Sequence, residues 1–351
     1  MKKIRLILLL TTAIMLSACD QKEYDESSTD VGRKVALRLG SGISASITRA
    51  YDTTWEAGDA IGVFTTKAAT TSVTKSGSQY DENIGYYTTQ EAQTYSGGSY
   101  SYRSFVPVSP GVEIYLPADG SAVDVYAYSP RNASVTASNP LSISIPTTQS
   151  RTSQKGIDVM KAKVASSVSA PVDIDHPEQQ LLFEHVMTKV LVYVMAGTGY
   201  GDDDLSGNKV SSVQLLGQPT SGSFAPVSQE LSITSGSSTI TMEEITDSYD
   251  PDYKTSYTIP ETSDTKNVLH VYRAIIFPNN DSTNPTTSGT GRQIKFNVGA
   301  TNYTYNITQT FSPGSQTVFA MRLSATGLEV NAAIQDWTHE TITPNPLYPQ
   351  D

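Results

Sequence analysis

Apolar and polar residues alternate in short runs along this chain, and no segment keeps a helical repeat over three turns. Gly, Pro and Asn residues separate the runs, as they do between the strands of β-sandwiches. Residues 190–195 are apolar on both faces, which indicates a central strand covered on both sides. The pattern predicts strands at residues 113–116, 123–128, 141–145, 189–194, 212–216, 268–277, 293–298 and 301–307. We therefore predict an all-β fold.

Residues 35–63 carry the most unusual pattern. Leu37 and Leu39 share one face of a predicted strand by two-residue alternation. A single basic residue, Arg49, follows in a run of small and hydroxylated residues, and residues 55–63 read as a turn that leads into a new strand. An extended segment, a trypsin-like cleavage point and a fresh strand together predict a strand that is made to be removed.

The composition is typical of an extracellular β protein. Of the 351 residues, 38% are apolar and only 17% are charged, and 20 are tyrosine. This length favours two domains, and the weak pattern at residues 165–177 predicts a boundary between them. We expect an N-terminal β-sandwich at residues 35–170, with a removable strand at residues 35–49, and a C-terminal β-sandwich at residues 171–351. The net charge of −11 argues against nucleic acid as a partner, although it also fits simple solubility.

The first nineteen residues predict export. Lys2, Lys3 and Arg5 precede an apolar stretch of secretory length, too short for a stable membrane span. Residues 16–19, Leu-Ser-Ala-Cys, look like a bacterial lipobox, in which the peptide is cut before the cysteine and the thiol is acylated. We expect a signal peptide at residues 1–18, lipidation of Cys19, and an acidic tether at residues 19–34. The mature chain would then be anchored at the surface of the outer membrane by lipid.

Catalytic and metal motifs are weak. The four histidines have no metal-ligand spacing, and no GxSxG elbow is present. Asp202, Asp204 and Ser206 match the opening of a calcium loop, but the twelfth position is Val213 where the loop needs Glu. A solvated acidic loop is the favoured interpretation. We expect no cofactor, no metal and no enzymatic activity.

Two aromatic residues and one histidine have alternative interpretations. Trp55 and Trp337 would suit a sugar-binding platform, but their apolar neighbours favour anchoring in a core. His185 lies next to the predicted central strand, and its expected role is that of a hydrogen-bonded core or turn residue.

Five segments together resemble the fimbrillin family, the type V pilus subunits of Bacteroides-like bacteria. The resemblance covers nearly all of the exported chain. Its segments are the lipobox; residues 47–49 with 55–63; residues 114–130; residues 158–162 with 182–190; and residues 311–315 running through 327–330 to 334–337.

The resemblance implies two transthyretin-like β-sandwich domains and export as a lipoprotein. It also implies cleavage by an Arg-specific surface protease, for which Arg49 and Ala50 are the matching positions. Loss of the strand before Arg49 would open a groove that another fimbrial subunit fills with a donor strand. Because groove and donor are different surfaces, the contact would propagate as a homo- or heteropolymeric fimbrium that serves adhesion.

In stalk members of the family, the donor is the C-terminal segment, and here the candidate lies at residues 327–351. Its apolar residues are Leu328, Val330, Ile334, Trp337 and Ile342. Three prolines near the end each remove a ladder donor, so a tip or accessory subunit that receives without donating is an alternative. A second alternative is an uncleaved surface lipoprotein that binds glycan or a host ligand through Tyr-rich loops at residues 80–102.

Overall fold

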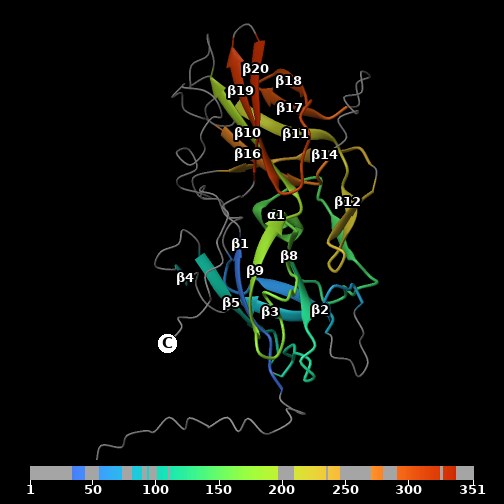
Figure 1. Ribbon diagram of the computed structural model, residues 1–351. Coiled ribbons are helices and arrows are strands. Elements are labelled where there is room, and N and C mark those ends of the chain that lie inside the picture. The colour runs from blue at the N-terminus through green and yellow to red at the C-terminus, as the bar shows by residue number, and fades with distance from the viewer. Residues whose placement is uncertain are drawn as a thin grey trace, which may run out of the picture.

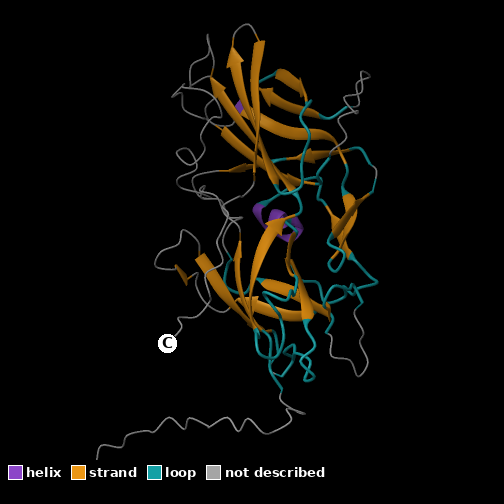
Figure 2. Ribbon diagram, in the orientation of Figure 1, coloured by secondary structure: helices purple, strands orange, loops and turns teal. Residues whose placement is uncertain are grey.

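The protein is almost entirely β-structure (Figure 2), which confirms the predicted all-β class. The computed structural model describes residues 34–43, 55–72, 81–88, 93–94, 101–109, 111–196, 209–234, 236–245, 270–279, 291–324 and 327–336. Its first strands are β1 (Arg38–Ile43), β2 (Ala60–Lys67), β3 (Ile84–Thr88), β4 (Gln93–Thr94), β5 (Ser101–Pro107), β6 (Val123–Ser129), β7 (Leu141–Ser144), β8 (Met160–Val164) and β9 (Glu178–His185). Then follow β10 (Thr188–Ala196), β11 (Val210–Gln218), β12 (Ser221–Ala225), β13 (Glu230–Ile233), β14 (Ser238–Thr241), β15 (Glu243–Ile245), β16 (His270–Ile276), β17 (Gln293–Val298), β18 (Thr301–Asn306), β19 (Ser315–Ser324) and β20 (Gly327–Asp336).

The N-terminal strands close into a ring, which we call the N-terminal barrel. Its pairing order is β1-β9-β8-β6-β2-β3-β5, and β5 pairs back to β1; the two residues of β4 pair with the first two residues of β5. The interior is filled by side chains that alternate along each strand, such as Val123, Val125 and Ala127 of β6. Closure leaves no free strand edge within this ring, as long as β1 is present.

Most C-terminal strands form two facing sheets, which we call the C-terminal sandwich, and β12 and β13 form a separate small sheet with β7. One sheet has the order β15-β16-β10-β19-β20, and the other β14-β11-β17-β18. Side chains from both sheets share one core, for example Val192 of β10, Phe319 of β19 and Phe296 of β17. Every residue of β10 is buried, and β10 lies between β16 and β19. The predicted central strand is therefore confirmed.

A short connection joins the two parts, which lie end to end in Figure 1 with α1 (Arg151–Ile157) between them. Ser150 caps this helix by accepting a hydrogen bond from the Ser153 backbone. Just before it, the side-chain amide of Gln149 donates to the Ile275 carbonyl at 2.6 Å and accepts from the Ile275 N–H at 2.9 Å. It thus pairs with the Ile275 backbone as a neighbouring strand would. Tyr126 and Tyr128, on the outer side of β6, pack into the core that the C-terminal sandwich uses. The two parts therefore share buried surface.

The structure also corrects the prediction at residues 113–116. This segment forms only an isolated bridge, between Tyr115 and Ala36, and no strand. Pro117 follows at once and has no N–H for a ladder, and a turn occupies residues 118–119. The domain boundary expected at residues 170–171 falls between β8 and β9, which are adjacent strands of the N-terminal barrel. The predicted loop at residues 279–291 lies almost wholly outside the described residues.

Candidate functional site: the slot that holds β1

The strand β1 is paired on both sides, although it comes first in the described chain. It runs parallel to β9, with Arg38 aligned to Glu178 and Ile43 to Phe183. On its other side it runs antiparallel to β5, where Leu39 is aligned to Phe105. Figure 1 shows β1 between these two strands. We call the space between β5 and β9 that β1 occupies the β1 slot.

The lower end of the slot is closed by the segment before β6. The Leu37 N–H donates to the Ile114 carbonyl at 2.8 Å, and the Leu116 N–H donates to the Val35 carbonyl at 2.9 Å. The Arg38 N–H donates to the Pro177 carbonyl at 2.8 Å. The backbone of β1 and of the residues just before it is therefore hydrogen-bonded along its length, as in a central strand.

The inner face of the slot is apolar. Leu37 and Leu39 are 3% and 4% exposed and belong to the core of the N-terminal barrel. Burial of a leucine side chain stabilises a fold by about 1.5–3 kcal/mol, so these two residues help to hold β1 in the slot. The sequence alternation correctly predicts that both leucines face the same side of the strand.

The floor of the slot is Trp55, which is 3% exposed. The centroid of its ring lies 5.1 Å from that of Phe105 of β5 and 5.0 Å from that of Phe183 of β9, and both contacts are edge-on. Because these two strands flank β1 and both rings point inward, the indole spans the gap beneath β1. The prediction that Trp55 anchors a core is confirmed, and such burial excludes a sugar platform at this residue.

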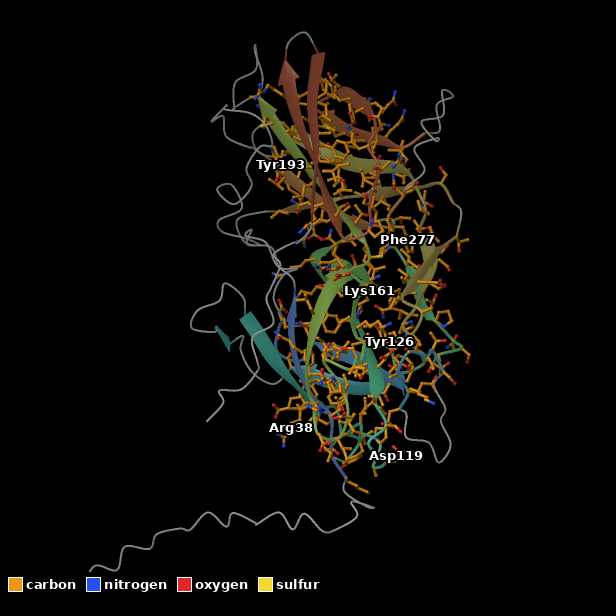
Figure 3. All side chains as sticks on the ribbon, viewed as in Figure 1. Arg38, Asp119, Tyr126, Lys161, Tyr193 and Phe277 are labelled. Carbon is orange, nitrogen blue, oxygen red and sulfur yellow. The ribbon has the colours of Figure 1, made fainter. Side chains whose placement is uncertain are left out.

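The outer face of the slot carries one ion pair. Arg38 Nη1 lies 3.0 Å from Glu178 Oε1, and the two side chains are 67% and 33% exposed. Arg38 projects from the outside of the N-terminal barrel in Figure 3. Exposed pairs of this kind are weak, worth about 0.2–1 kcal/mol, so the pair adds little to the stability of the strand in the slot.

A buried tyrosine supports the segment that pairs with the start of β1. Tyr86 of β3 is 1% exposed, and its hydroxyl accepts a hydrogen bond from the Ile114 N–H at 3.0 Å. Burial raises the pKa of Tyr86 to about 12; the hydrogen bond from Ile114 opposes this shift, and the nearby Asp81 and Glu113 charges add to it.

The chain is fixed again directly after the break in the described residues. Beside Trp55, the Glu56 N–H donates to Asp59 Oδ2 at 2.6 Å, and the Glu56 carboxylate pairs with Lys155 and, at 4.0 Å, with Arg151 of α1. The intervening residues 44–54, which include Arg49 and Ala50, lie outside the described residues. They therefore connect two anchored points, β1 before them and Trp55 after them.

The structure describes only some of the candidate donor residues. Leu328 and Val330 lie on β20, which pairs only with β19 at the edge of the C-terminal sandwich, and both pack against its core. Ile334, on the same face, is 48% exposed. Trp337 and Ile342 lie outside the described residues.

The other predicted site residues are not placed. Cys19, Asp202, Asp204 and Ser206 lie outside the described residues. Within the part of the chain that is described, no three His, Cys, Asp or Glu side chains are grouped as a metal ion would need. None of its helices is long and apolar enough to cross a membrane. His185 is buried, and its Nδ1 lies 2.8 Å from Asp158 Oδ1, which confirms a hydrogen-bonded core histidine.

Sequence reasoning missed the far wall of the slot. The pairing of β1 with β9 joins residues 140 positions apart, and nothing local to either strand signals it. Glu178 begins a run of three polar residues, Glu-Gln-Gln, before the apolar Leu181, and no strand is predicted there from the sequence.

Two solved structures of cell-adhesion type share this fold. A protein of Bacteroides uniformis described as a “putative cell adhesion protein” is 25% identical, with a TM-score of 0.61, and the match covers 87% of this chain and 98% of that one. A protein of Bacteroides ovatus with the same description is 18% identical, with a TM-score of 0.60 and coverage of 88% and 99%. The fold is thus that of a class of bacterial cell-adhesion β proteins.

The family follows from the sequence matches. The model of the family described as fimbrillin-like matches residues 48–337. A Bacteroides uniformis protein named “Putative fimbrium subunit Fim1C” is 30% identical over 354 residues, covering 96% of this chain and 96% of that protein. The chain belongs to the fimbrillin-like family, as its sequence motifs indicated, and so to the fimbrial and cell-adhesion proteins.

We predict that Leu39→Ala lowers the free energy of unfolding of the N-terminal barrel by about 2–5 kcal/mol, because it leaves a cavity beneath β1. The matched change Arg38→Ala, one residue away on the outer face, should cost at most about 1 kcal/mol. Denaturant unfolding of the uncleaved chain, followed by Trp55 fluorescence in a Trp337→Phe background, measures both, since the chain has 2 tryptophans. Equal losses of unfolding free energy in the two variants would mean that the inward-facing side chains do not hold β1 in the slot.

We also predict that Tyr86 makes the barrel sensitive to alkali. The pKa of its phenol is about 12 in the fold and about 10 in the unfolded chain, so its contribution is complete below pH 10 and is lost as the pH rises through 12. Relative to Tyr86→Phe, the wild-type chain should lose about 2 kcal/mol of stability between pH 10 and pH 12. Parallel stability curves for the two proteins would contradict this account.

Proposed function

We propose that the chain is a fimbrial subunit made as a lipoprotein precursor. It is acylated at Cys19, carried to the surface of the outer membrane, and cleaved between Arg49 and Ala50 by an Arg-specific protease. Cleavage releases the lipid anchor together with β1, and a donor strand from a neighbouring subunit then fills the slot. The observation that carries this proposal is that β1, the strand nearest the cleavage point, is paired on both sides.

The cost of an empty slot supports strand exchange. Removal of β1 would strip backbone partners from both β5 and β9 and uncover Trp55 and the phenylalanines beside it. An unpaired buried backbone group costs about 1–3 kcal/mol, and exposed apolar surface adds to this. A strand that restores both the hydrogen bonds and the apolar contacts is therefore strongly favoured.

The placement of the arginines supports cleavage at one point. After residue 54 the chain has six arginines, and each lies where a protease cannot readily thread the backbone. Four are in regular structure: Arg103 in β5, Arg151 in α1, Arg273 in β16 and Arg322 in β19. Arg292 is 4% exposed, and Arg131 donates to the Asn83 carbonyl at 3.4 Å. Arg38 lies in β1, which is paired on both sides, so Arg49 is the arginine that we propose for cleavage.

The segment that this chain itself would donate, to the slot of another subunit, is the C-terminal segment, residues 327–351. Leu328 and Val330 alternate along β20, which occupies a sheet edge and so can be extended or withdrawn without breaking a sheet in two. The two-domain organisation and the transthyretin-like type of each domain belong to the same proposal.

The test is the mature N-terminus on intact cells. We predict that the wild-type protein begins at Ala50 and forms SDS-resistant ladders, and that Arg49→Ala abolishes both and leaves an acylated Cys19 on a monomer. Arg33→Ala is the matched control, because it removes another arginine before the proposed cleavage point and should leave processing unchanged. N-terminal sequencing and intact mass measure the terminus.

An acyl-Cys19 terminus on a wild-type monomer would overturn the proposal. It would favour instead an uncleaved lipoprotein that binds glycan or a host ligand at the surface.

A further inference from the structure

We propose that the β1 slot selects a donor strand from a different subunit, one that carries a lysine or arginine at the position of Arg38. This inference rests on the proposed strand exchange and names the chemistry of the partner. It is carried by the ion pair on the outer face of the slot and by the composition of this chain's own C-terminal segment.

Glu178 is the residue of the slot wall whose charge is paired with a residue of β1. It begins β9, is aligned with Arg38 in the parallel ladder, and its carboxylate lies 3.0 Å from the Arg38 guanidinium. When β1 leaves, Glu178 stays with the acceptor, since β9 belongs to the barrel that remains. An incoming strand therefore places one of its outward residues beside this carboxylate.

The inner face determines which residues of a donor point outward. Leu37 and Leu39 fill the slot, so a donor must place apolar side chains at these two positions. The residue between them then faces outward beside Glu178, because successive side chains of a strand point to opposite faces. The affinity of the slot comes from the apolar row, and discrimination comes from the outward residue.

This chain's own C-terminal segment does not supply the charge. Residues 327–351 contain no lysine or arginine. If Leu328 and Val330 took the places of Leu37 and Leu39, the residue between them, Glu329, would lie beside Glu178. Two carboxylates facing each other disfavour that pairing, so a copy of this chain is a poor donor for its own slot. The partner in the filament is then a different subunit.

The experiment is a competition for the slot in the full chain cleaved at Arg49, in which β1 is held without a covalent link. A labelled peptide of residues 35–47 is exchanged into the slot and displaced by three unlabelled peptides in buffer of physiological salt. They are the same peptide, its Arg38→Glu version, and residues 327–339 of this chain. Protein variants are Glu178→Arg and the control Glu184→Arg, which changes a carboxylate of β9 beyond the end of β1.

We expect the wild-type slot to bind the Arg38 peptide about three- to tenfold more tightly than the Arg38→Glu peptide, as for an exposed pair changed to a like-charge pair. Glu178→Arg should reverse this order, and Glu184→Arg should keep it. The peptide of residues 327–339 should compete more weakly than the Arg38 peptide. Unfolding curves of each variant establish that its barrel is intact, and the three peptides test the wild-type slot even where a variant does not fold.

Two results would overturn the inference while leaving strand exchange in place. One is a peptide preference that Glu178→Arg does not change, and the other is a C-terminal peptide that competes as well as the Arg38 peptide. A cleaved chain that exchanges β1 for no peptide would instead contradict the proposed function, and this inference with it.

Discussion

A strand inside a sheet must have its backbone N–H and C=O groups paired on both sides, and in this protein that requirement falls on β1. Its neighbours, β9 and β5, belong to one ring of strands that closes only through β1. Removal of any other strand of the ring would break the chain in its middle. Removal of β1 needs a single cut in the connection that follows it. The barrel is therefore complete or open according to the state of one terminal strand.

The remainder of the barrel keeps the slot in shape around that strand. The Trp55 ring contacts both β5 and β9. The Tyr86 hydroxyl accepts a hydrogen bond from the Ile114 N–H, and the Ile114 carbonyl accepts one from Leu37, just before β1. The Glu56 carboxylate ties the chain that follows residues 44–54 to α1 through Arg151 and Lys155. Apart from the hydrogen bond from Leu37, these contacts do not involve β1, so under the proposed cleavage they would remain and would leave a slot that is preorganised for another strand.

Much of the fold can be predicted from local pattern, and the slot only in part. Strands such as β6, β10 and β17 show alternation or continuous burial that their own residues reveal. The strand β1 and the inward-facing Leu37 and Leu39 can be predicted for the same reason. The parallel pairing of β1 with β9 is not, because contacts between distant residues leave no periodic signal in either segment. Helix α1 has only seven residues, too few for a repeat to stand out, and its signal is the serine pair of its capping box.

The most direct test of the central claim is hydrogen exchange at the backbone amides of β5 and β9, in the uncleaved chain, in the cleaved chain after β1 is displaced, and in the assembled fibre. The account predicts strong protection in the uncleaved chain, faster exchange confined to these two strands when the slot is empty, and restored protection in the fibre. Unchanged protection of β5 and β9 after loss of β1 would contradict it, since the slot would then not depend on the strand that fills it.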